Sequence, residues 1–255
     1  MIKFSRVLSI CGGVLLAASA VAAQSQPGTV AALEFQTPKN GMVKQYEEGR
    51  KQKAAWHKEK KDPLALLVFE NLTGEGTGSY VVGRFGQHWA DFDNPPISDA
   101  ADREEFNKVI GTYVEKLVAR YYEYLPKIST LQMGGEPSKY TEVVEYFVKP
   151  GKDSDFRSAI DRSYDAIVKT KWPVTYGWYA LVNGGRSDTY VLVIAHPNWA
   201  DFEDKPGMKS FEDMLKEAFG QAEADSIIKR FDSSIEAEYS HISQYRPDLS
   251  YVPAK

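Results

Sequence analysis

The stretch Tyr80-Val-Val-Gly-Arg-Phe-Gly-Gln-His-Trp-Ala-Asp-Phe-Asp93 occurs a second time as Tyr190-Val-Leu-Val-Ile-Ala-His-Pro-Asn-Trp-Ala-Asp-Phe-Glu203. Five pairs of matching residues are separated by the same 110 positions: Pro63 and Pro173, Gly74 and Gly184, Tyr80 and Tyr190, Trp89 and Trp199, and Asp91 and Asp201. Self-similarity at a fixed period is the sequence signature of a duplicated structural unit. The sequence therefore predicts two tandem repeats, residues 30–133 and residues 140–252.

Both repeats show the same order of predicted elements. The first gives a strand over Val30–Thr37, a helix over Met42–Lys61, strands over Leu64–Phe69 and the quoted stretch, a helix from about Asp102 to Leu125, and a strand over Ile128–Met133. The second gives Thr141–Val148, Phe156–Lys171, Val174–Val182, the quoted stretch, a helix from about Ser210 into the 230s, and His241–Tyr245, which matches Lys127–Leu131. This is the β-α-β-β-α-β order of ferredoxin-like folds. We expect an α+β protein whose two repeats close an intramolecular dimeric α/β barrel, because each sheet has an open face to bury.

The N-terminus has the pattern of a secretory signal peptide. Lys3 and Arg6 precede an apolar run, and small residues stand before Gln24, so cleavage is expected after Ala23. The apolar run is shorter than the roughly 20 residues that a membrane span needs. The only cysteine, Cys11, lies inside this leader. The sequence thus predicts a periplasmic or secreted protein without disulfides or membrane insertion.

Charge excludes one class of partner. The formal net charge is −4, and removal of residues 1–23, with Lys3 and Arg6, makes it −6. A mildly acidic chain without a basic run is not typical of proteins that bind nucleic acid or an anionic membrane. Because the fusion supplies an internal partner, we expect a monomer that contains a pseudo-dimer.

The segment Tyr140-Thr-Glu-Val-Val-Glu-Tyr-Phe-Val-Lys-Pro-Gly-Lys-Asp-Ser-Asp-Phe156 resembles the first strand, turn and helix start of NIPSNAP and antibiotic-biosynthesis-monooxygenase-like proteins. The Trp that ends the repeated strand, followed by Asp-Phe, also resembles those families. The first repeat departs from the pattern, with Thr37-Pro-Lys-Asn-Gly41 in place of the Lys-Pro-Gly-Lys turn. The resemblance implies a dimeric α/β barrel, in a superfamily that includes cofactor-independent monooxygenases, haem proteins and proteins of unknown role.

Two residues of the first repeat are candidates for catalysis. His88 stands before Trp89 where the second repeat has Asn198, a difference that would mark one half as functional. Asp91 follows, and a histidine and a carboxylate together can transfer protons. The alternatives are structural. His88 would bond nearby backbone at the end of a strand, and Asp91 would accept backbone N–H groups before a helix.

Aromatic residues, at 13% of the chain, are concentrated on predicted strands. Tyrosine and tryptophan combine apolar area with a polar group, which suits a pocket for a flat ligand and suits a core between sheets equally well. The predicted ligand-binding residues are Trp89, Tyr80, Tyr176, Trp178 and Trp199. The predicted ligand is a small apolar or aromatic molecule.

The remaining histidines show no metal-ligand spacing, so we expect no metal site and no bound cofactor. His57 could ligate haem, but it lies in a heavily charged helix end and is expected to be solvated. His196 precedes Pro197 and is expected to cap the bend where its strand leaves the sheet.

Three functions stay open at this point. The first is binding of a small apolar or aromatic molecule in a pocket between sheet and helices. The second is a cofactor-independent monooxygenase-like or isomerase-like enzyme that uses His88. The third is a structural or protein-binding module of the cell envelope.

Overall fold

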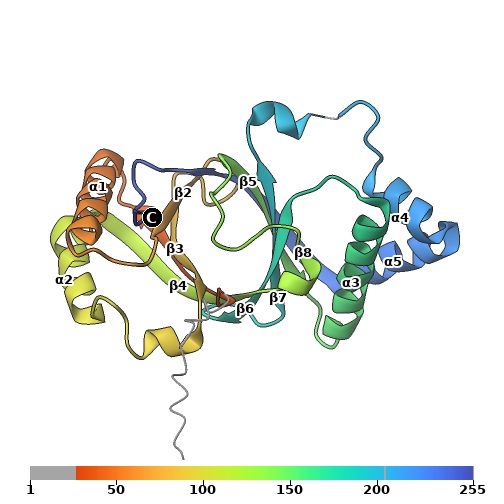
Figure 1. Cartoon of the computed structure of the whole chain (residues 1–255), viewed down its shortest axis with the longest axis horizontal. Helices are drawn as coiled ribbons and strands as arrows, with labels where there is room; N and C mark the ends of the chain where they lie inside the picture. Colours follow the sequence, from red (N-terminus) through yellow and green to blue (C-terminus); the bar gives the residue numbers. More distant parts are fainter. Residues whose placement is uncertain (1–26, 204, 255) are drawn as a thin grey trace, which may run out of the picture.

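The computed structural model describes residues 27–203 and 205–254, so the predicted leader lies outside the described residues. A central barrel of strands is flanked by helices on two opposite sides (Figure 1). Helices α1 and α2 lie on one side, and helices α3, α4 and α5 lie on the other. No helix among the described residues is long and apolar enough to cross a bilayer.

The first half of the chain forms four strands and two helices. They are β1 (Val30–Pro38), α1 (Val43–Glu59), β2 (Leu67–Asn71), β3 (Tyr80–Gln87), α2 (Asp99–Val109) and β4 (Val114–Tyr124). The second half repeats the order with one helix more. Its elements are β5 (Tyr140–Val148), α3 (Asp153–Thr170), β6 (Tyr176–Asn183), β7 (Thr189–His196), α4 (Phe211–Phe219), α5 (Gln221–Ser234) and β8 (Ile235–Tyr245).

The eight strands close a barrel in the order β1-β3-β2-β8-β5-β7-β6-β4. The two halves join through the antiparallel pairs β2–β8 and β4–β6, so the barrel leaves no open sheet edge. The strand register also repeats at the 110-residue offset. In the first half Glu34 is paired with Val82, and in the second half the corresponding residue Val144 is paired with Leu192. The predicted fold class, two tandem β-α-β-β-α-β units in one intramolecular barrel, is confirmed.

Two predicted elements of the first half are wrong. The helix expected to run from Asp102 to Leu125 ends at Val109, and Val114–Tyr124 is strand β4. This strand pairs along its length with β1, and barrel closure outweighs the helical spacing of its apolar residues. The expected strand Ile128–Met133 is absent; Pro126–Ile128 is a 3-10 turn, and Ser129 Oγ accepts a hydrogen bond from the backbone N–H of Trp178.

Two predictions for the second half also need correction. The helix expected from Ser210 into the 230s is broken at Gly220, whose φ of 84° separates α4 from α5. The segment His241–Tyr245 lies in β8, which pairs with β5 as β4 pairs with β1. Its counterpart is therefore β4 and not residues Lys127–Leu131.

The helix layers of the two halves differ in chemistry. Between α3–α5 and the sheet lies an apolar core that includes Tyr146, Phe156, Ile160, Trp178 and Met214. Between α1 and the sheet, the buried side chains include Gln36, Arg50, Lys53, His57 and Asp62.

The polar residues occupy places that are apolar in the second half. At the 110-residue offset, Glu34 corresponds to Val144, Tyr46 to Phe156, Arg50 to Ile160, His57 to Ile167 and Arg84 to Ile194. Buried polar groups need partners, and most of these side chains make hydrogen bonds or lie against an opposite charge. Arg50, for example, donates through Nε to the Tyr46 hydroxyl at 3.1 Å and through Nη2 to Gln36 Oε1.

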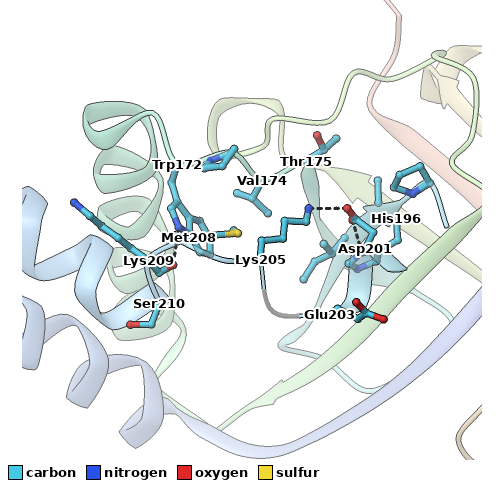
Figure 2. Close-up of a pocket in the computed structure, with 14 residues that line it drawn as sticks. Trp172, Val174, Thr175, His196, Asp201, Glu203, Lys205, Met208, Lys209 and Ser210 are labelled. Carbon is cyan, nitrogen blue, oxygen red and sulfur yellow. Dashed lines mark hydrogen bonds and ion pairs between the residues drawn. The ribbon is translucent and has the colours of Figure 1, made fainter. Parts of the chain in front are cut away.

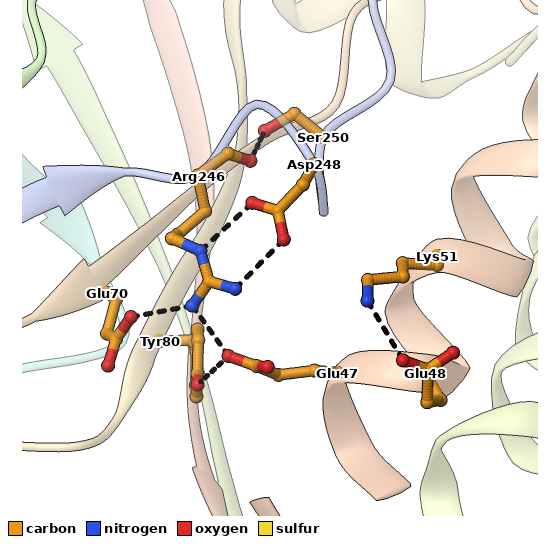
Figure 3. A network of polar contacts seen from close by, with 8 residues as sticks. All are labelled: Glu47, Glu48, Lys51, Glu70, Tyr80, Arg246, Asp248 and Ser250. Carbon is orange, nitrogen blue, oxygen red and sulfur yellow. Dashed lines mark hydrogen bonds and ion pairs between the residues drawn. The ribbon is translucent and has the colours of Figure 1, made fainter. Parts of the chain in front are cut away.

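The end of the chain is fastened to the first half by Arg246 (Figure 3). Its guanidinium lies 2.6 Å from Glu47 Oε1 on α1, 2.7 Å from Glu70 Oε2 on β2 and 2.9 Å from Asp248 Oδ2. The Tyr80 hydroxyl donates to the same Glu47 oxygen at 2.8 Å. The hydrogen bond from Arg246 lowers the pKa of Asp248. This network holds β8 and the residues after it against β2 and α1.

Candidate functional site

A cleft of about 690 Å³ lies in the second half, between the segment 172–175 that leads into β6, the end of β7 and the segment that leads into α4 (Figure 2). Its apolar wall includes Trp172, Val174, Ile194 and Met208. Its polar residues include His196, Asp201 and Lys205. Seven of the fourteen lining residues are apolar and seven are polar or charged, so the cleft offers both an apolar wall and hydrogen-bonding groups to a ligand.

His196 and Asp201 form a hydrogen-bonded pair in this cleft. Nδ1 of His196 lies 2.8 Å from Oδ2 of Asp201, which selects the tautomer with the proton on Nδ1. The other nitrogen, Nε2, is buried and has no hydrogen-bond partner among the described residues. A histidine held by a carboxylate at one nitrogen and without a partner at the other can accept a hydrogen bond or a proton from a ligand that reaches it.

Two further contacts fix the pair. Lys205 Nζ lies 2.6 Å from Oδ1 of Asp201, and the pKa of Asp201 is lowered first by this hydrogen bond and then by the one from His196. The ring of Phe202 stacks on the imidazole of His196, with 3.9 Å between the ring centroids. Asp201 thus stays ionised at neutral pH, and the imidazole has a fixed orientation.

Local sequence explains how the pair is built. Strand β7 ends at His196, and Pro197 cannot donate a ladder hydrogen bond that would continue it. Asn198 then begins the 3-10 turn Trp199–Phe202, where its side chain accepts from the backbone N–H of Asp201 at 3.2 Å. The turn brings the aspartate back beside the histidine five residues earlier.

The corresponding turn of the first half, Trp89–Phe92, contains the predicted catalytic residues. His88 is exposed at its start, and Asp91 Oδ2 accepts from the backbone N–H of His88 at 2.7 Å. Asp91 thus caps the turn, as the structural alternative describes. Both residues lie outside the cleft, and the catalytic roles stay predictions.

The five predicted ligand-binding aromatics are not brought together. Tyr80 is fully buried under α1, and Tyr176 and Trp178 are buried in the core of the second half. Trp89 packs against Phe92 and Tyr121, and Trp199 packs against Tyr140; about half of each indole is exposed. None of the five is among the residues that line the cleft.

The expectation for His57 is wrong, because its side chain is fully buried. Nδ1 lies 2.9 Å from Asp62 Oδ2, and Nε2 lies 3.4 Å from Asp102 Oδ1. Each nitrogen therefore faces a carboxylate, which does not fit the alternative of a haem ligand. Asp62 also pairs with Arg84 at 2.8 Å, and Asp102 pairs with Lys53 at 3.0 Å, so the cluster balances its own charge.

Burial, followed by the charge of Lys53, lowers the pKa of His57 to about 4. These two effects outweigh the neighbouring carboxylates. Since the unfolded histidine titrates near 6.5, the unfolded state binds the additional proton first as the pH falls. We therefore expect the free energy of unfolding to be constant above pH 6.5 with respect to His57 and to fall between pH 6.5 and about 4.

Denaturant titrations at steps between pH 7.5 and 4 measure this loss. The variant His57→Gln keeps a donor near Asp62 and should lose less stability over the same interval. The control variant His88→Gln, at an exposed histidine, should follow the unmodified protein. Equal pH dependence in all three proteins would contradict the assignment to His57.

One feature of the sequence points to the cleft. His196 stands in the place of Gly86 of the first repeat and five residues before an aspartate, although its position before Pro197 alone predicts a role at a bend. Trp172 and Met208 could not have been assigned to the same site, because no spacing rule connects residues that the fold alone brings together. The described residues contain no group of three or more His, Cys, Asp or Glu side chains that could hold a metal ion.

Comparison with known proteins identifies the architecture. No protein-family model matches the chain, and no curated protein does. Solved structures do match along most of its length. A "putative monooxygenase" from Lactobacillus acidophilus NCFM has a TM-score of 0.53 and 10% identity, over 90% of this chain and 97% of the other. The protein has the dimeric α/β-barrel fold.

Two further structures agree with this fold. A "putative monooxygenase" from Fusobacterium nucleatum has a TM-score of 0.54 and 12% identity, over 86% of this chain and 93% of the other. A "putative chlorite dismutase" has a TM-score of 0.52 and 8% identity, over 87% of this chain and 96% of the other. At identities this low, the structural similarity shows the fold and does not show the function. The function has to be argued from the residues of the site. The resemblance to NIPSNAP proteins stays a prediction.

Proposed function

We propose that the protein binds a small apolar or aromatic molecule in the cleft beside His196, which accepts a hydrogen bond or proton from it. The observation that carries this proposal is the buried Nε2 of His196, which has no partner among the described residues although Nδ1 is held by Asp201. The volume of about 690 Å³ lies within the range of about 300–1,000 Å³ that small-molecule sites occupy. The signal-peptide pattern predicted for residues 1–23 supports action in the periplasm or outside the cell.

Catalysis is the second candidate, and the His196–Asp201 pair favours it. A proton taken from an acidic O–H or C–H group of the ligand would reside on Nε2, and the ionised Asp201 would stabilise the resulting imidazolium. The monooxygenase descriptions of structures with the same fold support this direction by analogy alone. A protein-binding role in the envelope predicts no discrete small-molecule site.

Binding of 4-ethylphenol, a neutral aromatic with one O–H donor, tests the proposal by isothermal titration calorimetry. We expect one molecule per chain and about fivefold weaker binding to His196→Gln, since a hydrogen bond contributes on the order of 1 kcal/mol. The matched control His88→Gln changes the histidine at the start of the other turn and should bind within about twofold of the unmodified protein. Weaker binding to His88→Gln together with unchanged binding to His196→Gln would place the site at His88 and contradict the proposal. Absence of binding to the unmodified protein would also overturn it.

A further inference from the structure

Two hydrogen-bond acceptors lie side by side at the cleft: His196 lines it, and Glu142 stands next to His196 without being a lining residue. Glu142 Oε2 lies 3.7 Å from Nε2 of His196. Strand pairing explains why they share a face: Glu142 on β5 is opposite Ile194 on β7, Ile194 lines the cleft, and His196 follows two residues later. The Glu142 side chain is 38% exposed, so it is accessible to a ligand that reaches His196.

The charge around these acceptors is negative. The lysines that line the cleft are already paired, Lys205 with Asp201 at 2.6 Å and Lys209 with Glu217 at 2.8 Å. Glu142 has no lysine or arginine partner in the part of the chain that the structure describes, and an imidazole that carries its one N–H proton on Nδ1 gives it no counter-charge. An anionic ligand would therefore meet two acceptors, one of them an uncompensated carboxylate, whereas a cationic ligand would find a counter-charge.

The opposite wall suits an apolar body next to a positive charge. Trp172 lines it together with Val174 and Met208, and its indole Nε1–H donates to the carbonyl of Lys209 at 3.1 Å. This hydrogen bond fixes the ring. Tryptophan is the side chain that best attracts a cation to its face.

The first half of the barrel provides an internal comparison. At the 110-residue offset, Glu142 corresponds to Ala32, His196 to Gly86 and Trp172 to Asp62. Both acceptors and the indole are therefore confined to the second half. The shared fold does not require them, which is the expected pattern for residues that serve a ligand.

We infer that the ligand is an amine with an apolar or aromatic body, which enters as the ammonium ion. The ammonium donates to Glu142 and to Nε2 of His196, and the body packs against Trp172, Val174 and Met208. An –NH3+ group has three donors and can satisfy both acceptors at once. This inference rests on the proposed function, because it names the ligand class of the same cleft.

Calorimetric titration at pH 7.5 with phenethylamine, 3-phenylpropionate and 4-ethylphenol compares a cationic, an anionic and a neutral ligand that have similar aromatic bodies. We expect phenethylamine to bind at least about tenfold more tightly than 3-phenylpropionate, a difference of about 1.4 kcal/mol. Glu142→Gln should weaken phenethylamine about tenfold, whereas the control Glu238→Gln, an exposed glutamate on β8, should change it by less than about twofold.

The outcomes distinguish the two claims. Binding of 4-ethylphenol that depends on His196, without a preference for the amine or an effect of Glu142→Gln, overturns the amine assignment and leaves the proposed function standing. Tighter binding of 3-phenylpropionate than of phenethylamine also overturns it. Failure of all three molecules to bind overturns both.

Discussion

Replacement of Phe156 by alanine is expected to lower the free energy of unfolding by about 3–5 kcal/mol, the range for deletion of a buried aromatic ring. Phe156 is fully buried at the start of α3. Its ring centroid lies 4.8 Å from that of Tyr190, 5.3 Å from that of Phe231 and 5.9 Å from those of Tyr146 and Trp178. The cavity would open where helix and sheet meet, so little collapse can fill it.

Urea unfolding followed by circular dichroism measures this loss. Val168 on the same helix is 56% exposed and provides a matched control, since Val168→Ala should change stability by less than about 0.5 kcal/mol. A loss below about 1 kcal/mol for Phe156→Ala would contradict the placement of this ring in the core.

Replacement of Asp62 by alanine is expected to cost about 3–5 kcal/mol, the range for removal of one partner from a buried ion pair. The Asp62 side chain is 1% exposed and lies between Arg84 at 2.8 Å and His57 at 2.9 Å. Its removal leaves a guanidinium that is only 21% exposed without its carboxylate. The loss should appear as faster unfolding or a lower denaturation midpoint.

The second half suggests the rescue, because the place of Arg84 is taken there by Ile194. Adding Arg84→Ile to Asp62→Ala removes the unpaired charge and should recover a substantial part of the lost stability, since apolar replacement of a buried ion pair is often neutral or better. Glu59, whose side chain is 75% exposed at the end of α1, provides the surface control. A cost for Asp62→Ala no larger than that for Glu59→Ala would refute the account of this layer.

The duplication made the barrel predictable. Two copies of a ferredoxin-like order leave two open sheet faces, and burial of those faces against each other fixes the architecture. Strand β4 was not predictable in the same way. Tyr113, Leu117 and Tyr121 satisfy a helical spacing, and only pairing with β1, a non-local contact, decides for a strand.

The surroundings of His57 and His196 could not be predicted from the sequence either, because they too depend on contacts that only the fold creates. His57 stands in the charged run Trp56-His-Lys-Glu-Lys-Lys-Asp62, a pattern that predicts a solvent-exposed side chain. It is buried nevertheless, because the neighbouring Asp62 and Asp102 are neutralised by Arg84 and Lys53. For His196 the sequence predicts a role at a bend, whereas its ring pairs with Asp201 inside a cleft. In both places the environment of the histidine depends on carboxylates: Asp62 and Asp102 for His57, and Asp201 for His196. The fold sets the orientation of these carboxylates, so the sequence alone does not show the contacts.

The most direct test of the central claim is an NMR titration of protein with 15N-labelled histidine rings, using 4-ethylphenol as the probe. The account predicts that the Nε2 resonance of His196 moves and saturates with one equivalent bound, while the ring signals of buried His57 and of His241 on β8 stay in place. Binding that leaves His196 unchanged, or that shifts His57 or His88 in its place, would contradict a ligand site at the His196 cleft.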